Sequence, residues 1–278
     1  MDWTYKAVLT AMTVAAVLMV ARLMGRRAAG LLAGLPVITV PALLWVAQEQ
    51  GVDFAVHSAV GSAAACAMAP WFAASFVLLA RRFGAATSLA GAVLTAWLAV
   101  SLLQGLQARP GLALVAAALS CLFVLWWLGS PGRAGPAPGI DAGAGGLPTR
   151  SPSAMAGEPW VTAALAGVVS ATVALMALRV GPYWSGVLST LPLISACALV
   201  HLRRTGGPVA LPGFVSGYGV GVLAKALFLC SFAWAAPHWG VAPALVLAAM
   251  AGSTGALMLA RWQRRNRTPA KRVAASAP

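Results

Sequence analysis

The feature that most constrains this chain is a series of apolar stretches, each about 18–26 residues long, along most of its 278 residues. A helix needs about 20 apolar residues to cross a bilayer core of about 30 Å. Only 9% of the residues are charged, against roughly 25% in a soluble domain. The sequence therefore predicts an all-α, polytopic transmembrane helix bundle. We place nine spans at about residues 6–23, 28–47, 54–80, 84–105, 111–128, 160–178, 182–201, 211–236 and 240–261.

Basic residues are divided unevenly between the two sides of this predicted bundle. The side that holds the N-terminus receives Lys6, Arg109 and Arg179, and the other side receives all remaining Arg and Lys except Lys225. Because basic loops are retained in the cytoplasm, we expect the N-terminus outside and the C-terminus inside. The net charge of +14 then suits the anionic inner leaflet. Nucleic acid is not expected as a partner, because the basic residues lack interleaved aromatics or a folded scaffold.

Two segments outside the spans lack apolar periodicity. Residues 129–158 are rich in Gly, Pro, Ala and Ser, which predicts a flexible cytoplasmic linker. Residues 263–278 form a basic cytoplasmic tail. The four cysteines fall inside apolar stretches without a CxxC pair, so we expect neither a disulfide, a metal site nor a cofactor. They are Cys66, Cys121, Cys197 and Cys230.

The chain also matches itself at an offset of 156 residues, where GLLAGLPVITVPAL (30–43) aligns with GVLSTLPLISACAL (186–199) without a gap. Chance matches are common among Ala and Leu but not among glycines and aromatics. The offset pairs Gly51 with Gly207, Gly61 with Gly217, Phe72 with Phe228, Phe76 with Phe232 and Gly84 with Gly240. We therefore predict two four-helix repeats.

In this 4+1+4 arrangement, the repeats occupy residues 1–105 and 159–262, and a linking helix lies within 106–128. Four crossings plus the linking helix bring the chain to the opposite side of the membrane before the second repeat starts. The second repeat is therefore expected to be inverted relative to the first. Inverted repeats are typical of secondary transporters, because two near-equal halves can exchange inward-open and outward-open shapes.

The second span of each repeat contains a Gly-x5-Pro pattern with a hydroxyl three residues after the proline. The residues are Gly30, Pro36 and Thr39 in the first repeat and Gly186, Pro192 and Ser195 in the second. Proline frees a backbone carbonyl, which needs a polar partner inside a membrane. Two interpretations stay open: a packed kink satisfied by its neighbours, or a broken helix that lines a substrate site. Ser189 and Thr190 make the second copy more polar.

Lys225 lies in the middle of an apolar span, roughly 20 Å from either end. A lysine at this depth costs roughly 2.5–3.5 kcal/mol on insertion scales. It continues a stripe of glycines spaced by four, which lets another helix approach closely, so we expect it to face the bundle interior with Tyr218. The predicted packing glycines are Gly213, Gly217 and Gly221, with Gly61 in the first repeat.

No Asp or Glu lies inside any predicted span. Three explanations for Lys225 therefore remain open: a neutral amine, an ammonium held by carbonyls and hydroxyls, or an ammonium that meets a transient anion. The missing carboxylate also disfavours an exporter of cations.

A resemblance to a known family rests on short motifs in the first repeat: Ala29, Gly30 and Leu31, then Pro36 slightly later than the family's spacing, a polar loop ending in Gly51, and the helix with Gly61. Each repeat thereby resembles the GlpM-type family of small bacterial inner-membrane proteins, which are single units. The resemblance covers roughly residues 5–105 and 160–262. It implies duplication of one unit in a bacterial cytoplasmic membrane and supplies no mechanism, and Lys225 is not part of it.

The sequence favours a secondary transporter or exporter of a small anionic organic solute that works by alternating access. The predicted substrate-binding residues are Lys225, Tyr218, Ser189, Thr190, Ser195 and Thr39. The predicted hinge or kink residues are Pro36, Pro192, Gly30 and Gly186. The solute, the coupling ion and the direction of transport are not readable from the sequence, and a homodimer is compatible with it.

Two other classes of protein are alternatives to a transporter. A non-transporting partner of a membrane-bound biosynthetic or assembly complex stays open, because such proteins need only packed helices. An enzyme is not expected, since no cluster of His, Asp and Glu lies at a shared depth. No nucleotide-binding motif occurs, which argues against ATP-driven transport by this chain alone.

Overall fold

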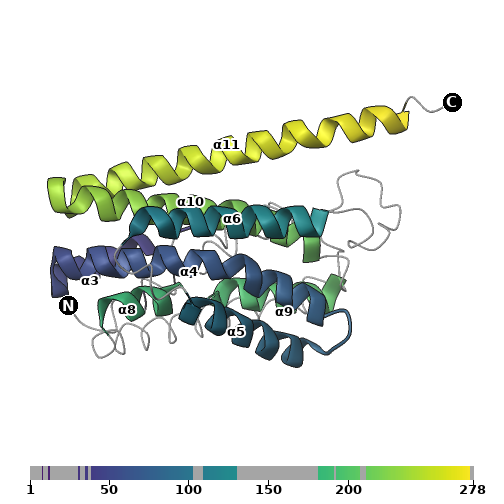
Figure 1. The fold of residues 1–278 in the computed structure, drawn as a ribbon, viewed down its shortest axis with the longest axis horizontal. Coiled ribbons are helices and arrows are strands. Elements are labelled where there is room, and N and C mark those ends of the chain that lie inside the picture. Colours follow the sequence, from purple (N-terminus) through teal and green to yellow (C-terminus); the bar gives the residue numbers. More distant parts are fainter. Residues whose placement is uncertain are drawn as a thin grey trace.

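The computed structural model describes residues 8, 12, 31, 35–36, 39–102, 109–129, 181–190, 192–206 and 211–275. Within these ranges all regular structure is helical and no strand occurs, which confirms the predicted all-α class (Figure 1). The helices are α3 (Thr39–Gln50), α4 (Val52–Leu79), α5 (Ala85–Leu102), α6 (Pro110–Gly129), α8 (Pro182–Ser189), α9 (Leu193–Gly206), α10 (Leu211–Trp239) and α11 (Val241–Ala275).

Four stretches of helix are long and apolar enough to cross a membrane: Val52–Leu79, Ala85–Leu102, Gly213–Trp239 and Val241–Arg261. They confirm a membrane protein. Apart from residues 8 and 12, the predicted spans 6–23 and 160–178 lie outside the described residues, as does nearly all of the linker 129–158. The count of nine therefore stays a prediction. The tail predicted from residue 263 begins as a continuation of α11, which extends to Ala275.

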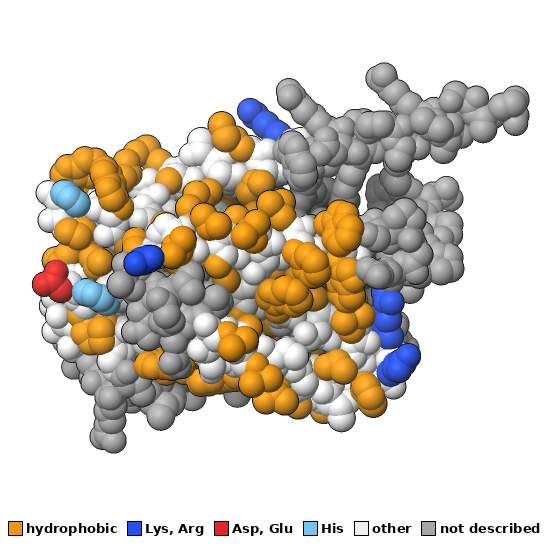
Figure 2. Space-filling model, in the orientation of Figure 1, with side chains coloured by type: hydrophobic (Ala, Val, Ile, Leu, Met, Phe, Trp, Pro, Cys, Tyr) orange, Lys and Arg blue, Asp and Glu red, His pale blue; other side chains and the backbone are white. Residues whose placement is uncertain are grey.

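The helices form an inner pair and an outer layer. In their most apolar windows, 78% of α4 and 72% of α10 are buried, against 22% of α5 and 17% of α11. The inner pair packs together around fully buried aromatic rings, among them Phe72, Phe76, Phe228 and Phe232. The outer helices instead expose large apolar side chains such as Leu94, Leu119 and Met250. Apolar side chains consequently cover much of the bundle surface in Figure 2, as expected for contact with a bilayer.

Two glycines set the ends of successive helices. Gly51 separates α3 from α4 with φ 89°, and Gly240 separates α10 from α11 with φ 81°. A residue with a Cβ is strained at such angles, whereas glycine adopts them readily. The chain can therefore reverse in a single residue at both positions. These tight turns place α11 against α10 and α3 against α4.

Two described helices begin at residues 156 positions apart. Helix α5 begins at Ala85 and α11 at Val241, each directly after a glycine whose carbonyl accepts the first helical hydrogen bond. Helices α4 and α10 run in opposite directions, as the chain path in Figure 1 shows. Contacts between the halves are reciprocal, since α5 packs against α9 and α11 packs against α3.

Charged residues differ between the two ends of this bundle. Asp53 and His57 lie at the start of α4, and His238 lies at the end of the oppositely directed α10, so all three share one end. Figure 2 shows acidic and histidine side chains gathered at that end, at left. Arg81 and Arg82 follow α4 at the opposite end.

Candidate functional site

The span predicted over residues 182–201 is divided into two helices. Helix α8 ends at Ser189 and α9 begins at Leu193, and we call the interruption between them, of which Thr190 and Pro192 are described, the break. Pro192 has no N–H with which to continue the helix. The Thr190 N–H instead donates to the Val187 carbonyl at 3.1 Å, and α9 starts with a bond of 2.7 Å from the Ala196 N–H to the Pro192 carbonyl.

The first half has a discontinuity at the equivalent proline. Leu35 and Pro36 form a bend, and α3 begins at Thr39. The Val40 N–H donates to the Pro36 carbonyl at 3.1 Å, as Ala196 does to Pro192 in the second half. In the second copy the helix is interrupted between α8 and α9, and its lining of a substrate site stays a prediction. Gly30 lies outside the described residues.

Helices α4 and α8 cross with their backbones in direct contact. A methyl group on Gly61 would collide with the Tyr183 carbonyl, and one on Gly186 would collide with the Ser58 carbonyl. The absence of side chains at the two glycines therefore determines how closely the helices approach. Gly186, predicted as a hinge, lies at this crossing inside α8 rather than in the break.

The glycines of α10 that are predicted to pack against another helix differ in their burial. Gly217 and Gly221 are buried as expected. Gly213 is exposed, and a methyl group there would meet nothing within 4 Å. The packing role predicted for Gly213 is therefore not found among the described residues, although Leu211 and Phe214 on either side of it are buried.

Serine hydroxyls gather where α8 meets α4. Ser62 and Ser189 each donate to the Gly186 carbonyl at 2.8 Å, and their two Oγ atoms lie 3.2 Å apart. The adjacent Thr190 is only 6% exposed, and its Oγ1 has no hydrogen-bond partner among the described residues. Sequence reasoning missed Ser62. The available signal was the spacing Ser58-x3-Ser62 beside Gly61, which puts hydroxyls and a glycine on neighbouring positions of one helix.

Tyr218 links α10 to the break. It is buried, it stacks on Phe214 with ring centroids 6.0 Å apart, and its hydroxyl hydrogen-bonds Ser195. Ser195 in turn donates to the Pro192 carbonyl at 2.9 Å. These two predicted binding residues are therefore brought together. Thr39 is buried at the start of α3, and no hydrogen bond of the described residues joins it to this group.

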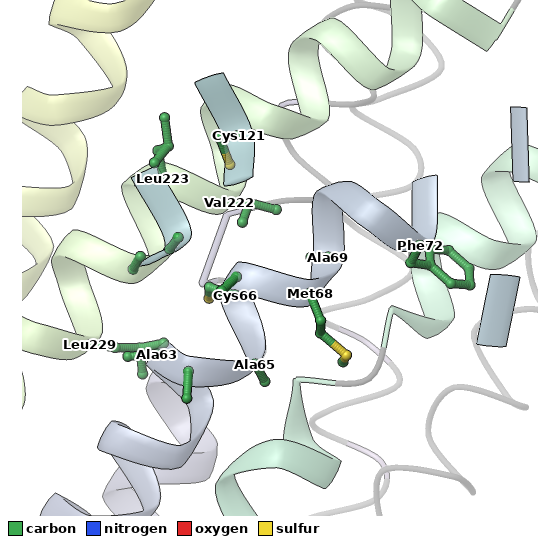
Figure 3. Packing of buried hydrophobic residues seen from close by; sticks show 14 of the residues in the cluster. Ala63, Ala65, Cys66, Met68, Ala69, Phe72, Cys121, Val222, Leu223 and Leu229 are labelled. Carbon is green, nitrogen blue, oxygen red and sulfur yellow. The ribbon is translucent and has the colours of Figure 1, made fainter. Parts of the chain in front are cut away.

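Lys225 lies on a buried stripe of α10, with Tyr218, Leu229 and Phe232. Its own side chain is half-buried, close enough to Cys66 of α4 for its charge to act on the thiol. Val222 of α10, three residues before Lys225, belongs to the same buried apolar cluster as Cys66 and Ala69 of α4, which Figure 3 shows from close by. Within the described part of the chain, no hydrogen bond or ion pair holds the lysine.

One small cavity lies between α4, α5 and the break. Its volume is about 20 Å³, and its lining is apolar, with Phe72, Trp97 and Pro192 among the contributing side chains. A cavity of this size holds about one water. It could not hold an organic solute. No group of three or more His, Cys, Asp or Glu that could hold a metal occurs among the described residues.

Comparisons with protein-family models, with curated proteins and with solved structures found no match to this chain. The resemblance of each repeat to GlpM-type proteins therefore stays a prediction.

Proposed function

We propose that this protein is a secondary transporter of a small anionic organic solute, and that two inverted four-helix repeats provide its alternating access. The observation that carries the proposal is the placement of Lys225. It lies on a buried stripe of α10, without an acidic partner among the described residues, and Tyr218 on the same stripe reaches the break. Broken helices near mid-membrane are where transporters of this architecture bind their solutes.

The inverted repeat has support from the reciprocal contacts between the halves. A two-fold axis exchanges equivalent helices, so packing of α5 on α9 requires packing of α11 on α3, and both contacts occur. If the second repeat were related to the first by translation alone, only one of these two helix contacts would form. The opposite directions of α4 and α10 favour an axis in the membrane plane.

The chemistry of Lys225 favours an anionic solute. An ammonium in a low-dielectric interior attracts negative charge far more strongly than it would in water. Neither Glu49 nor Asp53 lies at its depth, because both are at the end of the bundle where α3 meets α4. A carboxylate or phosphate on the solute would offset the cost of burying the charge while it is bound.

A second candidate has one observation in its favour. The cavity beside the break is apolar and only about 20 Å³, which suits a non-transporting partner of a membrane-bound complex. Under the transport proposal, the same closed packing is one state of the alternating-access cycle.

Flux through purified protein tests the proposal. We would reconstitute the chain in proteoliposomes and measure counterflow of a panel of small radiolabelled carboxylates and phosphate esters. Flux should be lost in Lys225→Ala and retained in Lys225→Arg. Arg261→Ala serves as the matched control, because it removes an exposed basic residue and should leave flux unchanged. No counterflow with any anion, together with full complementation of a deletion strain by Lys225→Ala, would favour the partner protein.

We also propose that the protein lies in the bacterial cytoplasmic membrane, with its N-terminus outside and its C-terminus inside. It follows from the excess of basic residues on one predicted side.

A further inference from the structure

Thr190 has a buried hydroxyl group that makes no hydrogen bond to the described residues. The residue is only 6% exposed, and its Oγ1 has no hydrogen-bond partner among the described residues. Leaving a buried hydroxyl unpaired costs about 1–3 kcal/mol, and native proteins leave few such groups without a reason. Pro192 adds to this polarity, because it cannot donate an N–H to the Leu188 carbonyl. The break therefore offers oxygen atoms that a ligand could use.

The serine hydroxyls at the contact of α8 with α4 and at the start of α9 present lone pairs rather than protons. Ser62 and Ser189 both donate to the Gly186 carbonyl, and Ser195 donates to the Pro192 carbonyl. Because these protons are engaged, the outward side of each oxygen can only accept or coordinate. The C-terminal end of α8 adds partial negative charge from its last carbonyls. Such a setting attracts a cation.

We propose that the break binds a monovalent alkali cation, Na⁺ in the first instance, through Thr190 Oγ1, the oxygens of Ser62 and Ser189, and carbonyls at the end of α8. This inference rests on the proposed function, for which it supplies the coupling ion. Half-helix C-terminal ends and unwound carbonyls are suited to this role in transporters built from inverted repeats.

The donor set excludes other cations by its chemistry. Ca²⁺ and Mg²⁺ are bound mainly through carboxylates, and the ligands named here are all neutral oxygens. Soft transition metals prefer sulfur or imidazole. A coupling proton cannot be held on hydroxyls and carbonyls, because none of them titrates near neutral pH.

The cation would lie near the proposed anion. Tyr218, which reaches the break through Ser195, is seven residues from Lys225 on the same face of α10, or about 10 Å along the helix axis. Because the two bound ions carry opposite charges, they attract each other in a low-dielectric interior. Binding of either should therefore raise the affinity for the other, and by the same factor.

Ion-dependent thermal stability of the detergent-purified full chain tests this site without any transport. We would compare NaCl, KCl and choline chloride at equal concentration, so that chloride is constant. With Na⁺ about 10- to 100-fold above its Kd, the unfolding midpoint should rise by about 3–10 °C relative to choline. Thr190→Val should abolish this rise, and Thr190→Ser, which keeps the hydroxyl, should retain it.

The matched control is Thr95→Val in α5. Thr95 already donates to the Ala92 carbonyl at 2.9 Å, so its variant should keep the full response to Na⁺. Equal midpoints in all three salts would overturn the site, as expected if Thr190 merely meets a buried water or if an anion occupies the break. Retention of the Na⁺ response in Thr190→Val would overturn it too. Anion flux without a Na⁺ response would reject this inference alone, whereas a Na⁺ response without flux would reject the proposed function.

Discussion

At the scale of single residues, Lys225 combines a high cost of burial with no partner that the described residues supply. If its purpose is to meet a transient anion, the empty protein should be less stable with the lysine than without it. We expect Lys225→Met to raise stability by about 1–3 kcal/mol while abolishing flux. Thermal unfolding in detergent measures the first effect. A structural lysine held by carbonyls predicts the reverse, a clear loss of stability in Lys225→Met.

The two crossing glycines lead to a second prediction at this scale. Gly186→Ala should destabilise the protein by about 1–3 kcal/mol or more, because the new methyl overlaps the Ser58 carbonyl and forces α8 away from α4. Gly213→Ala is the control, since a methyl group there meets nothing and alanine favours the helix. The measurement is the loss of helical circular dichroism on heating. Equal midpoints for the two variants would show that the close crossing does not form.

At the scale of elements, the break depends on one proline. Pro192→Ala restores an N–H and removes a helix penalty of about 3 kcal/mol, so α8 and α9 should join into a more continuous helix. We expect slower hydrogen exchange of the amides around residues 190–194, together with loss of flux because the exposed oxygens of the break are withdrawn into helical bonds. Mass spectrometry of a peptide covering these residues measures the exchange.

The matched variant for this prediction is Pro36→Ala, which changes the equivalent bend of the first half and leaves the break alone. Its effect on exchange at residues 190–194 should be nil. If the amides of residues 190–194 exchange as fast in Pro192→Ala as in the wild type, the break is maintained by tertiary packing and not by the proline.

At the scale of the whole molecule, the proposed inversion of the repeats makes a prediction about two positions that the repeat pairs. Phe83 and Trp239 lie 156 residues apart, next to the turn before α5 and the turn before α11, and they are 52% and 53% exposed. In a cysteine-free background, a membrane-impermeant maleimide should label Trp239→Cys in intact cells. It should label Phe83→Cys only after permeabilisation, because Arg81 and Arg82 keep that turn in the cytoplasm.

Labelling of both cysteines from the same side would contradict the inverted repeat and, with it, the basis for alternating access. Labelling of neither in intact cells but of both after permeabilisation would contradict it equally, because both turns would then be cytoplasmic. The experiment needs no knowledge of the solute.

Much of the helical layout was predictable from the sequence because it depends on local properties. Apolar length located α4, α5, α6, α10 and α11 to within a few residues at nearly every end that is described. The positions of Pro192 and Pro36 indicated where the second span of each repeat departs from a regular helix, because proline lacks the N–H that would continue the helix containing it. The burial of Gly217 and Gly221 followed from their spacing by four, which puts glycines on one face of a helix where a neighbour can approach closely.

Tertiary structure alone decided which faces of these helices meet. Ser62 and Ser189 are 127 residues apart, and nothing local connects a serine of α4 with the end of α8. Helices rich in Ala, Leu and Val offer many near-equal packings in lipid, where burial of apolar surface gives no preference. Steric fit at Gly61 and Gly186 selected one of them, and that choice brought the hydroxyls together beside Thr190.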